Sequence, residues 1–169
     1  MDRAELRRVQ EPLKERYRND PDAALVTLRA SGTLGDGVTC SVQTGRALAA
    51  AGLHPASGGD GTAICSGDLL LEALAACAGV TLRAVATSLE LDVEGSVDIE
   101  GDLDFRGTLG VDKEAPVGFR AIRVRFDLDT DASEEQLDTL LRLTIRYCVV
   151  WQTLVSSPEL SASWSRVEA

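Results

Sequence analysis

The chain has 169 residues, 44% hydrophobic and 26% charged, which is ordinary for a soluble protein of one domain. Its net charge of −10 argues against nucleic acid as a partner, because that binding depends on Lys and Arg that neutralise phosphates. An anionic membrane surface is disfavoured for the same reason. The opening sequence MDRAELRRVQ has no apolar stretch typical of a secretory signal, so we expect a cytoplasmic protein.

The first 23 residues are predicted to form a helical extension, followed by a single domain that spans residues 24–169. Residues 2–18 carry a thin apolar stripe at helical spacing. Pro12 lies inside this segment and is expected to break or kink the helix, because proline lacks the N–H that a helix needs.

The next segments predict a hairpin and a long loop. Residues 24–31 and 38–44 are typical of two strands joined across Gly-Asp-Gly. Residues 45–67 are predicted to be irregular, and a loop of this length inside a compact domain is usually functional.

Residues 68–89 form the strongest predicted helix, with Asp68 expected to cap its N-terminus. The segment is apolar on nearly all sides, which is typical of a helix buried in a domain or at the centre of an oligomer. Its length approaches that of a membrane span, but Glu72, Arg83 and a mid-helix Gly79 favour a buried core helix.

The remaining chain is predicted to contain four strands, at residues 91–99, 101–109, 121–128 and 160–167. Between the last two, Ser133 and Gln136 form a capping box for a helix that extends to Tyr147. The segment from Cys148 to Trp151 either continues this helix or starts another. The order of these elements predicts an α+β domain.

Four cysteines are spread along the chain: Cys40, Cys65, Cys77 and Cys148. They form no CxxC pair and the only histidine is His54, so we expect no metal site. In a reducing compartment such a cysteine is either a small buried hydrophobic residue or a reactive thiol.

Cys77 and Cys148 are the two candidate reactive thiols. Cys77 lies among small residues of the apolar helix and is either a packed core residue or, if its thiol pKa is lowered, a nucleophile. Glu72 and Arg83 share one face of that helix and are equally consistent with a charge pair. If Cys148 starts a helix, the exposed N–H groups would stabilise its thiolate. Local position favours Cys148 as the nucleophile, but spacing alone does not decide.

Two motifs resemble a known family. SGDLLLEALAACAGVTL, which contains Cys77, follows a Gly-Gly loop, and RYCVVWQTL, which contains Cys148, lies a little over seventy residues later. Together they resemble the OsmC/Ohr superfamily of osmotically inducible protein C and the organic hydroperoxide resistance proteins. The resemblance covers the chain from about Ala24 to its end. It implies an OsmC/Ohr-like fold, in which strands wrap around two central helices in an intertwined homodimer.

The resemblance also implies a chemistry, that of a cysteine-dependent peroxidase in the stress response. The cysteine that matches Cys77 attacks the O–O bond of a small organic hydroperoxide as a thiolate and becomes a sulfenic acid. The cysteine that matches Cys148 then forms a disulfide with it, and an external dithiol such as a lipoyl group reduces both. No resident cofactor is needed. The family thus reverses the local preference for Cys148 as the nucleophile.

The sequence departs from the family pattern at two activating residues. The family's Asn-Pro-Glu before the cysteine helix is Cys65-Ser66-Gly67 here, and its hairpin-turn arginine is missing from residues 32–37. The candidate replacements are Asp68, Glu72, Arg29, Arg46 and Arg83. Two other functions remain open: a non-catalytic dimer that binds a small apolar ligand, and a thiol redox sensor.

Overall fold

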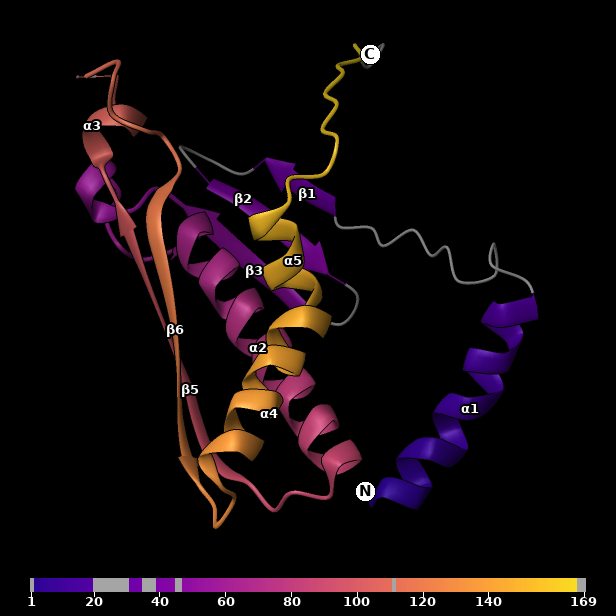
Figure 1. Ribbon diagram of the computed structural model, residues 1–169. Helices are drawn as coiled ribbons and strands as arrows, with labels where there is room; N and C mark the ends of the chain where they lie inside the picture. The colour runs from indigo at the N-terminus through magenta and orange to yellow at the C-terminus, as the bar shows by residue number, and fades with distance from the viewer. Residues whose placement is uncertain (1, 20–30, 35–38, 45–46, 111, 167–169) are drawn as a thin grey trace.

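The structure is a computed structural model, which describes residues 2–19, 31–34, 39–44, 47–110 and 112–166 (Figure 1). Its elements in chain order are α1 (Arg3–Asn19), β1 (Ser31–Leu34), β2 (Thr39–Thr44), β3 (Ala47–Gly52), the 3-10 helix η2 (Pro55–Ser57), β4 (Ile64–Cys65), α2 (Ser66–Leu89), β5 (Glu94–Leu103), α3 (Phe105–Thr108), β6 (Phe119–Asp129), α4 (Glu134–Tyr147) and α5 (Val149–Val155). This mixture of helices and strands confirms the predicted α+β class.

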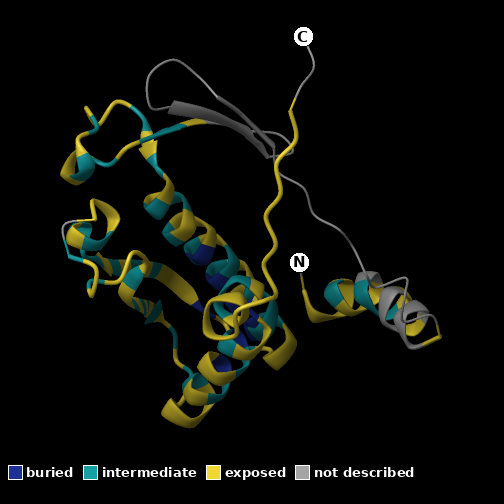
Figure 2. Ribbon diagram, turned by 90° about the horizontal axis from the view of Figure 1, so that it is seen from above, coloured by how far each residue is buried: buried dark blue, intermediate teal, exposed yellow. Residues whose placement is uncertain are grey.

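Helix α2 is the centre of the fold, and the other main elements pack around it. The long β5–β6 hairpin lies along one side, and α4 and α5 cross another side (Figure 1). The buried residues, dark blue in Figure 2, gather where these elements meet α2. Four of them, Leu74, Ala78, Leu82 and Ala86, recur every fourth residue and so form one stripe along the helix.

Helix α1 touches the body near the end of α2, where Arg3 forms an ion pair of 2.8 Å with Glu90. A break at Pro12, one of the two expected effects, is wrong, because α1 runs without interruption from Arg3 to Asn19; a kink there stays a prediction. One missing hydrogen bond does not end the helix here, since residues of high helix propensity flank the proline on both sides.

The first four strands form one sheet in the order β1-β2-β3-β4, antiparallel except for the parallel pair β3–β4. The pairing of β1 with β2 confirms the predicted hairpin, although residues 24–30 lie outside the described residues. The predicted irregular segment 45–67 is wrong in part, because it contains β3, η2 and β4. The β3 sequence is rich in Ala, which has low strand propensity, so its strand depends on pairing with β2.

Strand β5 replaces most of the two short strands predicted at residues 91–99 and 101–109. Gly101 does not end β5; it pairs with Ile122, and a side chain at its position would meet the Phe119 ring at 2.5 Å. The glycine therefore marks a close approach rather than a break. Residues 105–108, predicted as strand, form α3 instead, capped by Asp104, whose carboxylate accepts from the Arg106 N–H.

The predicted starts of α4 and α2 and the strand predicted at residues 160–167 have different outcomes. The capping box of Ser133 and Gln136 is confirmed at the start of α4, with hydrogen bonds of 2.8 and 3.3 Å. Cys65, not Asp68, is the N-cap of α2, and Asp68 lies in the first turn, where its charge favours the helix dipole. The strand predicted at 160–167 is absent: residues 160–166 form no regular structure, because alternation alone supplies no neighbouring strand.

One buried polar group in this core lacks a partner. The Thr144 hydroxyl of α4 is the single buried side-chain oxygen or nitrogen without a hydrogen bond among the residues that the structure describes. Thr144 itself is 1% exposed. An unsatisfied buried hydroxyl costs about 1–3 kcal/mol relative to its hydrated state.

We therefore predict that Thr144→Val, which keeps the side-chain shape and removes the hydroxyl, raises the free energy of unfolding by about 1 kcal/mol. Urea unfolding of the reduced protein measures this change. The matched control is Thr153→Val, because Thr153 is exposed and donates to the Val149 carbonyl at 2.9 Å, so its loss is nearly neutral. A less stable Thr144→Val protein would contradict the assignment of an unpartnered hydroxyl.

Candidate functional site: the paired thiols of α2 and the α4–α5 turn

Cys77 and Cys148, 71 residues apart in the sequence, meet in the folded chain. Cys77 lies in the middle of α2 and is half-buried, whereas Cys148 sits between α4 and α5 and is 1% exposed. Both are free thiols, Cys77 packs against the core cluster that contains Cys148, and each thiol influences the pKa of the other. The structure thus brings together the two cysteines that the sequence singled out.

The position of Cys148 depends on a break between two helices. Its backbone is extended, at φ −72° and ψ 109°, so α4 ends and α5 begins there. This settles the open alternative in favour of a restarted helix. In a continuous helix the Val149 N–H would donate to the Ile145 carbonyl. Here the Gln152 amide donates to that carbonyl instead, at 2.9 Å, which leaves the Val149 N–H for another acceptor.

The first N–H groups of α5 act on Cys77. Partial burial raises the pKa of the Cys77 thiol, but hydrogen bonds from the Val150 N–H, the Cys148 thiol and the Val149 N–H outweigh it. The net effect lowers the pKa of Cys77, because each of these donors favours the thiolate.

Cys148 has the opposite balance. Burial raises the pKa of its thiol more than hydrogen bonds from the Trp151 and Val150 N–H groups lower it. The hydrogen bond to Cys77 and the charge there raise the pKa of Cys148 further, because a second thiolate beside the first is unfavourable. Cys77 is therefore the more acidic thiol of the pair and the one that ionises first, opposite to the preference from local position alone.

Thr81 is a site residue that the sequence analysis missed. Its hydroxyl donates to the Cys77 carbonyl at 2.7 Å, and it also lowers the pKa of the Cys77 thiol. A hydroxyl has one proton, so it serves either the carbonyl or the thiolate at one time. The available signal was the spacing, since a residue four positions after Cys77 lies on the same helix face.

The surroundings of the pair are apolar. Cys77 and Cys148 belong to one core cluster with Leu74 and Ala78 of α2. Val97 and Phe126 of the hairpin and Trp151 of α5 pack against it. Such walls favour contact with an apolar molecule and exclude water from the sulfur atoms.

The three candidate activating residues on α2 do not reach the thiols. Asp68, Glu72 and Arg83 are exposed, and at about 100° per residue each lies more than about 110° around the helix from Cys77. Arg83 pairs with Glu94 at 3.3 Å and donates to the Val93 carbonyl, so the expected pair with Glu72 is not formed. Arg29 and Arg46 lie outside the described residues.

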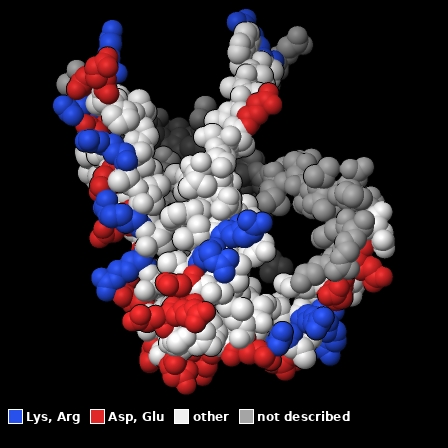
Figure 3. All heavy atoms as spheres, in the orientation of Figure 1, with Lys and Arg blue, Asp and Glu red and all other residues white. Residues whose placement is uncertain are grey.

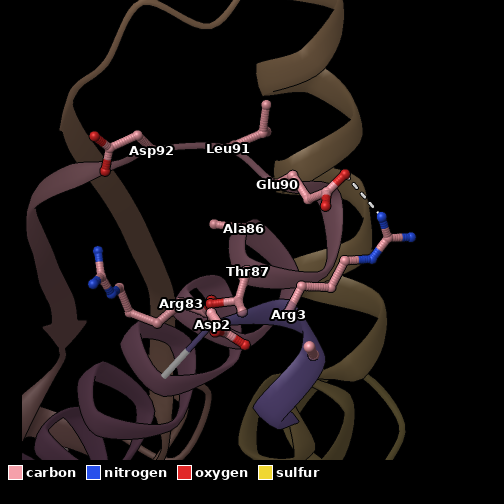
Figure 4. Close-up of a pocket in the computed structure, with 9 residues that line it drawn as sticks. Asp2, Arg3, Arg83, Ala86, Thr87, Glu90, Leu91 and Asp92 are labelled. Atoms are coloured by element: carbon pink, nitrogen blue, oxygen red, sulfur yellow. Dashed lines mark hydrogen bonds and ion pairs between the residues drawn. The ribbon is translucent and has the colours of Figure 1, made fainter. Parts of the chain in front are cut away.

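Other candidate sites lie away from the pair. Cys65 starts α2, about 18 Å along the helix axis from Cys77 at 1.5 Å per residue. A groove of about 530 Å³ lies between the start of α1 and the end of α2, with Arg3, Arg83 and Glu90 among its lining residues (Figure 4). Within the described ranges, no group of three His, Cys, Asp or Glu could hold a metal ion.

A pair of thiols of unequal pKa, one on the central helix α2 and one at the break between α4 and α5, defines a class of candidate thiol redox proteins. The sequence model of the OsmC-like protein family matches residues 59–163, which include both cysteines. The chain therefore belongs to the OsmC-like family, within the OsmC/Ohr superfamily. A search of curated protein sequences finds no match.

Solved structures share the fold. An OsmC-like protein from Mycoplasma pneumoniae aligns with a TM-score of 0.66 and 16% identity, over 78% of this chain and 89% of that chain. The organic hydroperoxide resistance protein OhrB of Bacillus subtilis aligns with a TM-score of 0.51 and 20% identity, over 79% and 94%. An organic hydroperoxide resistance protein OsmC from Legionella pneumophila aligns with a TM-score of 0.54 and 18% identity, over 78% and 90%.

The pKa difference between the two thiols predicts their order of reaction with iodoacetamide. Cys77 reacts with a midpoint pH below that of an ordinary thiol, and Cys148 reacts later and at higher pH. Cys148→Ala removes one donor to the thiolate, so it moves the Cys77 midpoint to higher pH. Peptide mapping of the adducts as a function of pH measures both.

The control is Cys65→Ala, which leaves the Cys77 midpoint unchanged because Cys65 is not part of the pair. An unchanged midpoint in Cys148→Ala would show that the thiol–thiol hydrogen bond does not stabilise the Cys77 thiolate.

Proposed function

We propose that this protein is a cysteine-dependent peroxidase that reduces organic hydroperoxides, with Cys77 as the nucleophile and Cys148 as the resolving thiol. The observation that supports it most is the packing of Cys77, a thiol of lowered pKa, against the cluster that holds Cys148, a buried thiol of raised pKa. Membership of the OsmC-like family, and its structural similarity to proteins named for organic hydroperoxide resistance, support a role in peroxide stress.

The proposed cycle has three balanced steps. The Cys77 thiolate attacks the outer oxygen of ROOH, the O–O bond breaks, and with one proton the products are a sulfenic acid and the alcohol ROH. The Cys148 thiol then displaces water from the sulfenic acid and forms the Cys77–Cys148 disulfide. An external dithiol, such as a lipoyl group, reduces this disulfide and is itself oxidised. No resident cofactor takes part, and the need for a dithiol suits the cytoplasm.

We predict that one equivalent of an organic hydroperoxide, such as cumene hydroperoxide, removes two hydrogens from the reduced protein. Intact mass and peptide mapping locate the bridge between Cys77 and Cys148. Cys148→Ser stops at the Cys77 sulfenic acid, because no resolving thiol remains, and goes on to the sulfinic acid with excess peroxide. Cys65→Ser, the matched control, still forms the bridge. Oxidation scattered over all four cysteines would contradict the proposal.

A homodimer is part of the proposal, because α2 is strongly apolar and the described part of the chain leaves much of it uncovered. An 18-residue stretch of α2 has a mean hydropathy of 1.8, enough for a membrane span, yet only 22% of it is buried. Val80 on this helix is 72% exposed. In a protein whose fold packs α2 centrally, the simplest cover for this face is a second copy.

We therefore expect sedimentation velocity to give a dimer, and Val80→Glu to weaken it. The charge would be buried without a partner, which raises the dissociation constant at least tenfold. Val117→Glu is the matched control, since Val117 is 66% exposed but lies in the loop before β6. Equal behaviour of the two variants would place the interface elsewhere.

A specific observation favours a second function, the binding of a small apolar ligand. A cavity of about 180 Å³ lies between α2 and the hairpin, lined by Gly79, Val97, Phe126 and other mainly apolar residues. In that case a ligand would bind equally well to Cys77→Ala, and the thiols would react no faster than free cysteine. A redox sensor, the remaining alternative, would form the disulfide but show no sustained turnover with a dithiol.

A further inference from the structure

A basic groove lies at the junction of α4 and α5, apart from the thiol pair. It encloses about 500 Å³ and is lined by Arg142, Ile145, Arg146, Tyr147 and Gln152. In Figure 3 basic side chains lie over the upper part of α4, and acidic side chains lie below them, over the start of the helix. The groove therefore presents positive charge on a protein whose net charge is −10.

The two arginines of this groove differ from the other arginines of the domain. Between residues 50 and 155 the sequence has seven arginines, and five of them form ion pairs with carboxylates: Arg83, Arg106, Arg120, Arg123 and Arg125. In the described part of the chain Arg142 and Arg146 form none, although Asp138 lies one turn before Arg142. Arg146 instead stacks over the Tyr147 ring, 5.8 Å from its centre.

Two of the last carbonyl groups of α4 have donors other than these arginines. A basic side chain near a helix C-terminus stabilises carbonyl groups that lack donors. Here the Thr144 carbonyl accepts from the Cys148 N–H at 2.9 Å, and the Ile145 carbonyl accepts from the Gln152 amide at 2.9 Å. Because no ion pair among the described residues engages Arg142 or Arg146, and both line the groove, their guanidinium groups are available to a ligand there.

We propose that this groove is a binding site for the oxyanion of a small ligand, a carboxylate or a phosphate. Arg142 and Arg146 are one helical turn apart and lie on the same face of α4, so two guanidinium groups can hold one oxyanion with charge-assisted hydrogen bonds. The Gln152 amide is fixed by its bond to the Ile145 carbonyl and lines the groove from α5. The walls thus come from both helices that meet at Cys148.

Calorimetric titration of the reduced full-length protein with inorganic phosphate, and separately with acetate, tests this site at constant ionic strength set by sodium chloride. We expect saturable binding of at least one of the two, with one site per chain. Saturation by phosphate alone identifies a phosphate ligand, and saturation by acetate alone identifies a carboxylate. Binding that does not saturate for either would overturn the proposal.

Variants locate the binding. Arg142→Gln and Arg146→Gln each weaken it at least tenfold, because each removes a charged hydrogen-bond donor. The matched control is Arg125→Gln, which changes the net charge equally but removes an arginine already paired with Asp127. An equal loss of affinity in Arg125→Gln would show that overall charge, and not the groove, determines binding, and would overturn the site.

Two further measurements keep the test decisive if a glutamine variant unfolds. Arg146→Lys keeps the charge but loses the planar fork, so it weakens binding less than Arg146→Gln. In the wild-type protein, phosphate or acetate shifts the Nε–Hε NMR signals of Arg142 and Arg146 and leaves that of Arg125 unchanged. Equal shifts of all three signals, Arg125 included, or no shift in any of them would overturn the site.

Discussion

The break in the backbone at Cys148 is the constraint on which the rest of the site depends. A continuous helix would engage the Val149 and Val150 N–H groups in its own hydrogen bonds. Because Cys148 is extended, these groups reach Cys77 on α2 instead, and the Gln152 amide takes the place of the Val149 N–H at the Ile145 carbonyl. The break thereby leaves the Ile145 carbonyl of α4 with a hydrogen-bond donor and supplies N–H donors to a sulfur atom on another helix.

Apart from the charge that Cys77 itself carries as a thiolate, no charged side chain is among the main influences on the pKa values of the two thiols. Cys77 is favoured as a thiolate by N–H groups and by the Cys148 thiol, while burial disfavours the thiolate of Cys148. Fixed backbone donors inside an apolar cluster are screened by salt far less than surface ion pairs are. The same arrangement supports the proposed order of the reaction, because the thiolate attacks first and the thiol that resolves it is already in contact.

The sequence predicts the parts of the fold that depend on local patterns. The capping box of Ser133 and Gln136, the apolar helix and the alternating strand β6 follow from short-range rules and are confirmed. Predictions failed where a distant partner decides: the Ala-rich β3 exists because β2 pairs with it, and the tail at 160–166 pairs with no strand among the residues that the structure describes. The family resemblance implied that Cys77 and Cys148 act as a pair. Their contact became visible only in the folded structure, because they are 71 residues apart in the sequence. Thr81 and the role of the α5 N–H groups depend on a break whose geometry no local pattern specifies.

The cleavage of a hydroperoxide requires stabilisation of the leaving oxygen, which the described thiol pair does not supply by itself. A thiol of lowered pKa supplies the thiolate, but a thiolate loses nucleophilicity as its pKa falls, so ionisation alone gives a limited rate. The departing oxygen develops negative charge, and its stabilisation is commonly the larger contribution to catalysis. Asp68, Glu72 and Arg83 point away from Cys77 around α2. A fast peroxidase built on this pair therefore requires a donor for the leaving oxygen from outside α2, carried by another segment of the chain or by a second copy placed against the exposed face of this helix.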